Sequence, residues 1–294
     1  MRSNEYEWPG RWGGRTLGAP HRVPRGVGMG LREVFDATRD EFAALAPVVW
    51  DRLGQALADV SEPAAGEHVL DACCGIGSSA APAARAVGPD GSVDAVDLSP
   101  ELVDVGARRA AGLGNLRFAV GDVTAWTGRA GGYDLVQCAF GVFFLPDMDD
   151  AVRGLVRLLR PGGRFAAAVW RAGALEEFGA AYRDVVARVK DGPGARGQEP
   201  QRSEAGRINT EDSLGTWLWS VGCVDVRART FELREPVSDG LAWNLVLGSG
   251  FRSSLDGLGA AEVERVRAGL LAELAARGVV EIDFSAVLGV GTRG

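Results

Sequence analysis

The chain has 294 residues, 46% of them hydrophobic, which is enough to bury the core of one large domain or of a domain with a cap. No run approaches the roughly 18 apolar residues of a membrane-spanning helix, and no apolar signal core follows the first basic residue. The net charge is −7, whereas proteins that bind nucleic acids usually carry an excess of positive charge. We therefore expect a cytoplasmic protein that acts on a small molecule, with no membrane or nucleic-acid partner.

The cysteines and histidines are few and scattered. The four cysteines form neither a disulfide framework nor a CxxC pair, and no histidine cluster offers metal ligands. They are Cys73, Cys74, Cys138 and Cys223. We expect free thiols in a reducing compartment and no metal.

The first part of the chain, residues 1–28, is rich in Gly, Arg, Pro and Trp and shows no helical or strand period. This composition favours a disordered leader. The alternative is a lid in which Tyr6, Trp8 and Trp12 close over a ligand.

Helical and strand periods follow in order. Apolar residues recur at helical spacing between Leu31 and Val60, so residues 29–62 are expected to hold one or two helices. Residues 63–170 then alternate between strand and helix patterns. The predicted strands are 68–73, 92–97, 116–120, 133–138 and 164–170, and the predicted helices are 78–87, 100–112 and 148–159. This alternation is typical of a parallel sheet with helices on both faces.

The rhythm changes after residue 170. Residues 171–222 are expected to hold cap helices at 174–189 and 210–221, joined by a Gly/Pro/Arg/Gln-rich loop at 190–207. Residues 223–294 are expected to add the last two strands, at 224–233 and 285–292, with two cap helices inserted between them within 241–277. The sequence thus predicts an α/β fold with a seven-stranded, mainly parallel sheet, an antiparallel last strand and helical cap insertions.

The strongest local signal is the segment Val69–Gly77, an apolar strand that ends in a Gly-x-Gly turn and opens a helix. Glycines let the backbone approach a ligand closely, and a helix N-terminus favours an anionic group. The turn also fits the GxGxxA dinucleotide fingerprint, and Asp97 lies 20 residues after Gly77. An NAD-dependent oxidoreductase is therefore one reading of this segment.

Two acidic residues favour a different cofactor. Asp71 lies inside the first strand, where its carboxylate would repel a pyrophosphate and suits an ammonium group. The third strand also ends in an acidic turn, Gly121-Asp122.

These motifs together resemble the class I S-adenosylmethionine-dependent methyltransferases, and among them the branch that methylates quinones and natural products. The motifs are Asp71–Gly77, Asp97, Asp122, Tyr133–Cys138 and Arg160–Arg164, within a resemblance that covers about residues 31–292. The resemblance implies a Rossmann-like core at residues 63–170 that binds S-adenosylmethionine and releases S-adenosylhomocysteine. The Ala-, Gly-, Arg- and Val-rich composition is what a GC-rich genome would encode, and together with the resemblance it suggests bacterial secondary metabolism.

The resemblance also implies roles by position for the loop after the first strand. Gly75 and Gly77 would pass the methionine part of the cofactor, and Asp71 would support the loop or the cofactor amine. Cys73 belongs to the same loop. Asp97 would accept from both ribose hydroxyls.

Further roles fall on the ends of the later strands. Leu98 would pack on the adenine, and Asp122 would accept from the adenine N6 amine with Val123 beside it. Cys138 would line the sulfonium side through its backbone carbonyl. For Asp97 and Asp122 the alternative is a solvated strand end or a helix cap.

No imidazole base is evident near these motifs. Phe143 stands where relatives often carry a histidine, and the two histidines, His21 and His68, lie elsewhere in the sequence. A Ser/His/Asp hydrolase is disfavoured for the same reason. An acceptor that is already nucleophilic, such as an amine, carboxylate, thiol or activated carbon, suits such a site.

Aromatic residues supply the candidate acceptor contacts, with core packing as the alternative for each. A dry apolar pocket and in-line positioning favour methyl transfer without an acid or base. The candidates are Phe140, Phe143, Phe144, Trp170, Tyr182 and Trp243. A non-methylating protein of the same fold, such as a scaffold or a cyclase-like catalyst, is the second alternative function, and a homodimer is an open oligomeric state.

Overall fold

The computed structural model describes residues 31–192, 194, 195, 197 and 204–294, so the leader or lid expected at residues 1–28 lies outside the described residues. A seven-stranded sheet with the strand order β3-β2-β1-β4-β5-β9-β6 forms its centre. The strands are β1 (His68–Ala72), β2 (Ser92–Asp97), β3 (Leu116–Val120), β4 (Tyr133–Ala139), β5 (Leu159–Trp170), β6 (Cys223–Phe231) and β9 (Ala286–Arg293). Strands β1 to β5 pair in parallel, and β9 is antiparallel to β5 and β6. The predicted sheet is confirmed.

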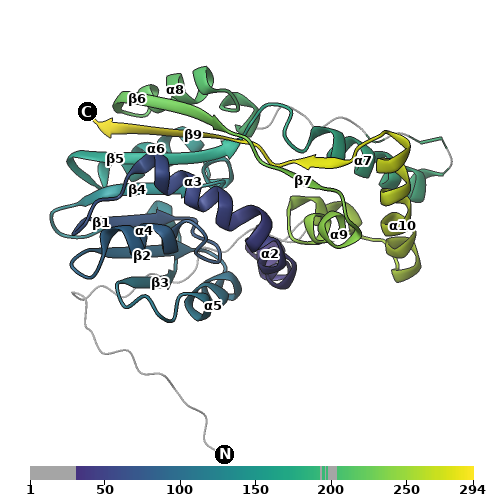
Figure 1. The fold of residues 1–294 in the computed structure, drawn as a ribbon, viewed down its shortest axis with the longest axis horizontal. Coiled ribbons are helices and arrows are strands. Elements are labelled where there is room, and N and C mark those ends of the chain that lie inside the picture. The colour runs from purple at the N-terminus through teal and green to yellow at the C-terminus, as the bar shows by residue number, and fades with distance from the viewer. Residues whose placement is uncertain (1–30, 193, 196, 198–203) are drawn as a thin grey trace, which may run out of the picture.

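Helices cover both faces of the sheet (Figure 1). They are α3 (Asp51–Ser61), α4 (Ala80–Val87) and α5 (Pro100–Arg109) on one face, and α6 (Met148–Arg157) and α8 (Glu211–Ser220) on the other. Val69 and Leu135 point into the first interface, and Leu70 and Val136 into the second. Because both faces are covered, the central strands are apolar on consecutive residues.

The remaining elements lie beyond the carboxyl ends of the parallel strands. The helical cap consists of α7 (Glu176–Asp191), α9 (Asp239–Leu247), α10 (Ala260–Ala276) and the two-stranded sheet of β7 (Arg234–Pro236) and β8 (Glu281–Asp283). The N-terminal elements are α1 (Leu31–Asp36), α2 (Arg39–Leu45) and the π-helix η1 (Ala46–Trp50). Helix α2 lies beside α9 (Figure 1), and a Cβ on Gly248 would come within 2.9 Å of the Phe42 nitrogen. The cap and the N-terminal helices therefore meet over one edge of the sheet.

The structure differs from the sequence predictions at two places. Helix α8, expected in the cap, packs on β6 and β9 instead, because Gly289 leaves room for its side chains: a Cβ there would lie 2.7 Å from Leu218 and 2.8 Å from Leu214. Strands β7 and β8 were not predicted, since three residues are too few to show a period. Within the described part of the chain, no helix is long and apolar enough to cross a membrane.

Candidate active site

The glycine loop, residues 73–79, connects β1 to α4 at the carboxyl edge of the sheet. Gly75 and Gly77 have φ angles of +51° and +80°, which glycine adopts without strain. A Cβ on Gly77 would lie 2.6 Å from the Phe118 ring, so the loop can pack on β3 only with bare backbone at this position. Cys73 is also left-handed, with φ of +57°, a conformation that costs a non-glycine residue about 1 kcal/mol. The left-handed backbone angles and the contact with Phe118 therefore fix the shape of the loop.

Asp97 at the end of β2 holds this loop. Its carboxylate accepts the backbone N–H of Gly75 at 2.8 Å and that of Ser99 at 2.9 Å. Burial raises the pKa of Asp97 above its ordinary value, against the opposing effect of the bonds from Ser99 and Gly75. A carboxylate has about four lone-pair positions, so Asp97 retains acceptor sites for a ligand's hydroxyl groups.

Asp71 is fully buried within β1. Its carboxylate accepts the Ser79 hydroxyl, 2.8 Å away at the start of α4. Burial raises the pKa of Asp71 to about 7, and the bond from Ser79 lowers it in part. Of the two roles that the resemblance implies for Asp71, this geometry favours support of the loop over contact with a cofactor amine.

The ends of β2 and β3 form an apolar shelf beside two carboxylates. Asp122 accepts from the Thr124 backbone N–H at 2.9 Å and from its hydroxyl at 2.7 Å, and so caps the short helix η2 (Val123–Ala125). Leu98 and Val120 are 45% and 53% exposed, whereas Val123 is buried. Apolar surface flanked by Asp97 and Asp122 complements a ring that carries hydroxyl and amino groups.

Two thiols lie next to each other, that of Cys73 directly after β1 and that of Cys138 near the end of β4. A Cβ on Gly141 would come within 2.8 Å of the Cys138 sulfur and 2.9 Å of the Cys73 sulfur. The contact with Cys138 and then burial raise the pKa of the Cys73 thiol well above its usual range. At neutral pH Cys73 is therefore a protonated thiol and does not serve as a base.

An aromatic cluster, defined here as Phe42, Trp50, Phe140 and Trp170, adjoins the glycine loop. The Phe140 and Trp170 ring centroids are 4.3 Å apart, and Trp50 lies 6.0 Å from Phe140 and 5.9 Å from Trp170. Phe42 stacks on Trp50 at 4.7 Å, and its ring would be 3.6 Å from a Cβ on Gly75. The cluster therefore closes over the loop from the N-terminal helices.

The sequence analysis did not identify Phe42 and Trp50 as candidate site residues. Their only signal was helical spacing, which core residues share. Trp50 ends the π-helix η1, a geometry that is frequent at functional sites. Its indole nitrogen is buried and has no hydrogen-bond partner among the residues that the structure describes.

A second aromatic group lies on the short helix η3 (Val142–Phe144). The rings of Phe143 and Phe144 are 4.8 Å apart, and Phe35 of α1 meets Phe144 edge to face at 5.5 Å. Phe144 is 42% exposed. Helix α1 thus covers part of the same edge of the sheet.

Part of the chain matches a known protein family and its members. The model of a methyltransferase domain family matches residues 69–163. The aklanonic acid methyltransferase DauC of Streptomyces sp. (strain C5) is 35% identical over 147 residues, which cover 49% of this chain and 67% of DauC. The chain belongs to the class I S-adenosylmethionine-dependent methyltransferases.

Other relatives of this methyltransferase match over shorter spans. The nocamycin O-methyltransferase of Saccharothrix syringae is 35% identical, over 46% of each chain. A demethylmenaquinone methyltransferase of Staphylococcus aureus (strain JH9) is 34% identical, over 33% of this chain and 41% of its own. The chain therefore spans less than half the length of these two relatives.

Solved structures share the fold of the methyltransferase. YcgJ of Bacillus subtilis aligns over 82% of this chain and 98% of its own, with a TM-score of 0.51 and 17% identity. The [4+2]-cyclase SpnF aligns over 90% of this chain and 96% of its own, with a TM-score of 0.53 and 18% identity. The NAD-dependent oxidoreductase considered from the sequence is not supported, because the family model and the named relatives are methyltransferases.

The described residues fit S-adenosylmethionine. Gly75 and Gly77 give the glycine loop bare, left-handed backbone at this edge, and Asp97 retains acceptor sites beside the exposed Leu98. The structure brings the predicted cofactor residues to one edge of the sheet. They are Asp71, Cys73, Gly75, Gly77, Asp97, Leu98, Asp122, Val123 and Cys138.

The structure separates the six predicted acceptor contacts of the methyltransferase into two groups. Phe140, Phe143, Phe144 and Trp170 lie at the carboxyl edge. Tyr182 is fully buried in α7 and donates its hydroxyl to the Phe251 carbonyl at 3.0 Å. Trp243 of α9 packs under the Arg267 guanidinium, 5.8 Å from its ring centre. Their surroundings give Tyr182 and Trp243 packing roles in the cap.

No histidine lies at this edge among the residues that the structure describes. His68 begins β1, at the opposite end of the strand, and its ring is bonded to the Ser92 hydroxyl at 2.9 Å. His21 lies outside the described residues. A mechanism that uses an imidazole has no support from the described edge of the sheet.

Proposed function

We propose that this methyltransferase acts on a flat, largely apolar small molecule, such as a natural product with an aromatic ring system. The observation that supports this proposal is the aromatic cluster, in which Phe140 and Trp170 stand 4.3 Å apart beside the glycine loop. Aromatic faces and edges pack well against other rings and exclude water. A flat, apolar acceptor would pack against these rings better than a polar one would.

The cofactor would be held by the strand ends. Asp97 would bind the ribose hydroxyls, Asp122 the adenine amine, and Leu98 and Val123 the adenine ring. When bound, S-adenosylmethionine supplies a methyl group on a positively charged sulfonium. The glycine loop would carry the methionine part, which brings the sulfonium end toward Cys73 and Cys138.

The acceptor atom would be nucleophilic before it binds, because the described edge of the sheet offers no imidazole base. The aromatic side chains would orient this atom and exclude the water that solvates the sulfonium charge. Positioning of this kind is worth on the order of 7 kcal/mol or more in favourable cases. A carboxylate oxygen needs no base to become nucleophilic, since a carboxylic acid is already ionised at neutral pH.

The names of two relatives support oxygen as the acceptor atom. One is named for aklanonic acid, and another is named as an O-methyltransferase. The first comes from a Streptomyces and the second from a Saccharothrix, which supports a role in bacterial secondary metabolism. In a bacterial cytoplasm the thiols of Cys73 and Cys138 would stay reduced.

A second candidate function is a reaction without methyl transfer. The fold likeness to the cyclase SpnF and the lack of an imidazole at the described edge of the sheet support this alternative. The two functions differ in whether the cofactor is consumed.

The experiment combines cofactor binding with turnover. Calorimetric titration with S-adenosylhomocysteine should give micromolar affinity, about −8 kcal/mol, and titration with NADH should give none. A panel of planar aromatic carboxylic acids is then incubated with methyl-labelled S-adenosylmethionine, with the matching amides as controls. Label should pass to the acids only.

Variants connect turnover to the aromatic cluster. Trp170→Leu should lower transfer at least tenfold and leave S-adenosylhomocysteine affinity within twofold. Trp219→Leu is the matched control, because Trp219 is 70% exposed on α8, away from the cluster. Cofactor binding without label transfer to any acid would reject the proposed acceptor class and favour the second candidate.

A further inference from the structure

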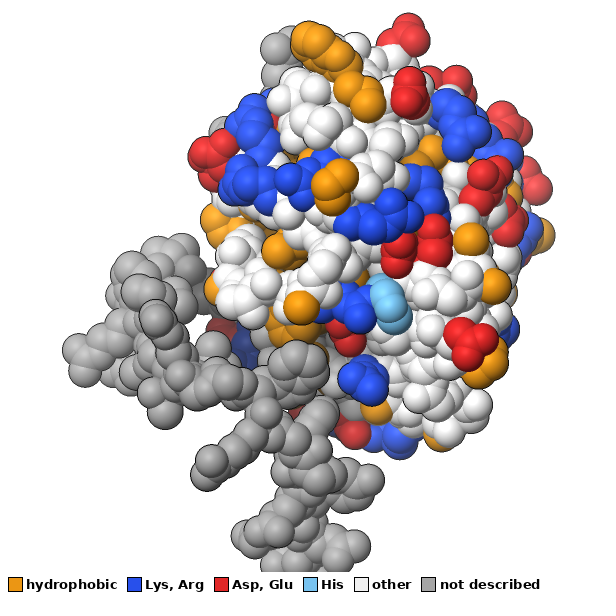
Figure 2. Space-filling model, turned by 90° about the vertical axis from the view of Figure 1, so that its left-hand side faces the viewer, with side chains coloured by type: hydrophobic (Ala, Val, Ile, Leu, Met, Phe, Trp, Pro, Cys, Tyr) orange, Lys and Arg blue, Asp and Glu red, His pale blue; other side chains and the backbone are white. Residues whose placement is uncertain are grey.

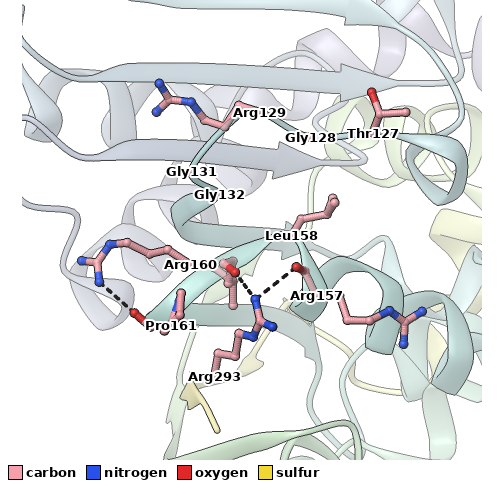
Figure 3. A pocket seen from close by; sticks show the side chains of 11 residues that line it. Thr127, Gly128, Arg129, Gly131, Gly132, Arg157, Leu158, Arg160, Pro161 and Arg293 are labelled. Atoms are coloured by element: carbon pink, nitrogen blue, oxygen red, sulfur yellow. Dashed lines mark hydrogen bonds between the residues drawn. The ribbon is translucent and has the colours of Figure 1, made fainter.

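A cavity of about 310 Å³ lies at the edge of the sheet opposite the candidate active site, where the parallel strands begin. It is formed where β4 and β5 begin and β9 ends, together with the loop before β4 and the end of α6 (Figure 3). Strands β1 to β5 run in parallel, so their starts are a strand length away from the glycine loop. The cavity is therefore separate from the site of methyl transfer.

Four arginines line this cavity: Arg129, Arg157, Arg160 and Arg293. Arg160 pairs with Asp134 at 2.5 Å. Arg293 reaches across the floor and donates to the backbone carbonyls of residues 157 and 159 (Figure 3). Neither Arg129 nor Arg157 has an ion-pair partner among the described residues. The cavity thus carries an excess of positive charge in a chain whose net charge is −7. Figure 2 views the molecule from the side where the parallel strands begin and shows several Lys and Arg side chains across this face.

The wall between Arg129 and Arg160 is a glycine-rich loop. Gly128, Gly131 and Gly132 have φ angles of +71°, +85° and +80°. A Cβ on Gly132 would lie 2.6 Å from the Arg160 backbone nitrogen, so the loop rests directly on the start of β5. Exposed peptide N–H groups in such loops form concave sites for anions in many proteins.

We propose that this cavity binds a small anion with two adjacent phosphate groups, of the diphosphate class. Guanidinium groups match phosphate oxygens in pairs, and the four arginines that line the cavity come from three separate stretches of chain. Among the described residues Arg129, Arg157 and Arg293 form no ion pair, and their three charges correspond to the two or three charges of a diphosphate. A volume of about 310 Å³ is at the lower end of the range for small-molecule sites.

Calorimetric titration of the full-length protein with inorganic pyrophosphate tests this proposal. S-adenosylhomocysteine is present at saturation, so the cofactor site is filled, and ionic strength is kept constant. We expect one pyrophosphate per chain. Citrate, titrated in the same way, carries similar charge without phosphate groups and should bind at least tenfold more weakly.

Two pairs of substitutions remove equal charge from different places. Arg129→Gln with Arg157→Gln should weaken pyrophosphate binding at least tenfold. Arg108→Gln with Arg265→Gln is the matched control, because both side chains are exposed on other helices, and its affinity should stay within twofold. All variants should bind S-adenosylhomocysteine like the unmodified protein, which shows that they are folded.

Three results would overturn the proposal. These are no pyrophosphate binding by the unmodified protein, an equal loss in the control pair, and tighter binding of citrate than of pyrophosphate. The single variant Arg157→Gln repeats the test at an exposed position, should the double variant fail to fold.

Discussion

The backbone N–H of Gly75 points at the carboxylate of Asp97, 2.8 Å away, although the two residues belong to different strand-turn units. Asp97 also accepts the N–H of Ser99 at the start of α5. One carboxylate therefore fixes the glycine loop relative to the end of β2. The side chain that we propose as the ribose acceptor therefore also fixes the shape of the glycine loop.

The first prediction concerns this link. Asp97→Ala should lower S-adenosylhomocysteine affinity by 100-fold or more, because it removes the proposed ribose acceptor and the hydrogen bond that holds Gly75. Asp104→Ala is the control, since Asp104 is exposed on α5 and forms an ion pair with Arg108 of the same helix. Calorimetry measures both. Equal affinities in the two variants would contradict the assignment of Asp97.

The second prediction concerns the buried carboxyl of Asp71, whose pKa is raised to about 7 from an ordinary 3.8. Between these pH values the folded protein keeps a proton that the unfolded chain has lost, so this group's contribution to stability falls as pH rises from about 4 to 7. Asp71→Asn keeps an acceptor for Ser79 and removes this dependence. Its free energy of unfolding, relative to wild type, should increase over this range by up to about 4 kcal/mol and stay constant above pH 7.

Urea unfolding at several pH values measures that difference. The exposed Asp59→Asn is the control and should differ from wild type by less than about 0.5 kcal/mol throughout. A stability difference for Asp71→Asn that does not change with pH would show that Asp71 titrates in its ordinary range.

The third prediction compares two glycines with nearly equal backbone angles. Gly77 and Gly66 have φ of +80° and +81°, but a Cβ would be 2.6 Å from Phe118 in the first and in open space in the second. Gly66→Ala should cost about 1 kcal/mol from backbone strain. Gly77→Ala adds a clash and should cost about 3 kcal/mol. Urea unfolding of both variants checks this, and equal costs would refute the close approach.

The fourth prediction concerns Tyr182, a sequence candidate for acceptor contact. Its hydroxyl donates to the Phe251 carbonyl inside the cap, so Tyr182→Phe should cost about 1 kcal/mol of unfolding free energy. The Michaelis constant for an accepted substrate should not change. A rise in this constant of fivefold or more, at unchanged cofactor affinity, would restore Tyr182 as an acceptor contact.

The sequence alone determined the chain order of the seven strands of the main sheet and the placement of the acidic residues at their ends. Val69–Gly77 and the strand ends at Asp97 and Asp122 are local patterns, and parallel strands bring their carboxyl ends to one edge. Strand and helix periods reflect which faces are buried, and a continuous stretch of chain records them. For this reason the sheet and the candidate cofactor residues were predictable.

Only the tertiary structure decided the contacts between distant segments. Phe42 and Trp50 join Phe140 and Trp170 because α2 and η1 fold over the sheet edge, and helical spacing alone does not tell which neighbour a face meets. Helix α8 lies on β9 rather than in the cap because Gly289 leaves space for it. Such contacts depend on the shapes of surfaces far apart in the chain, which no local pattern records.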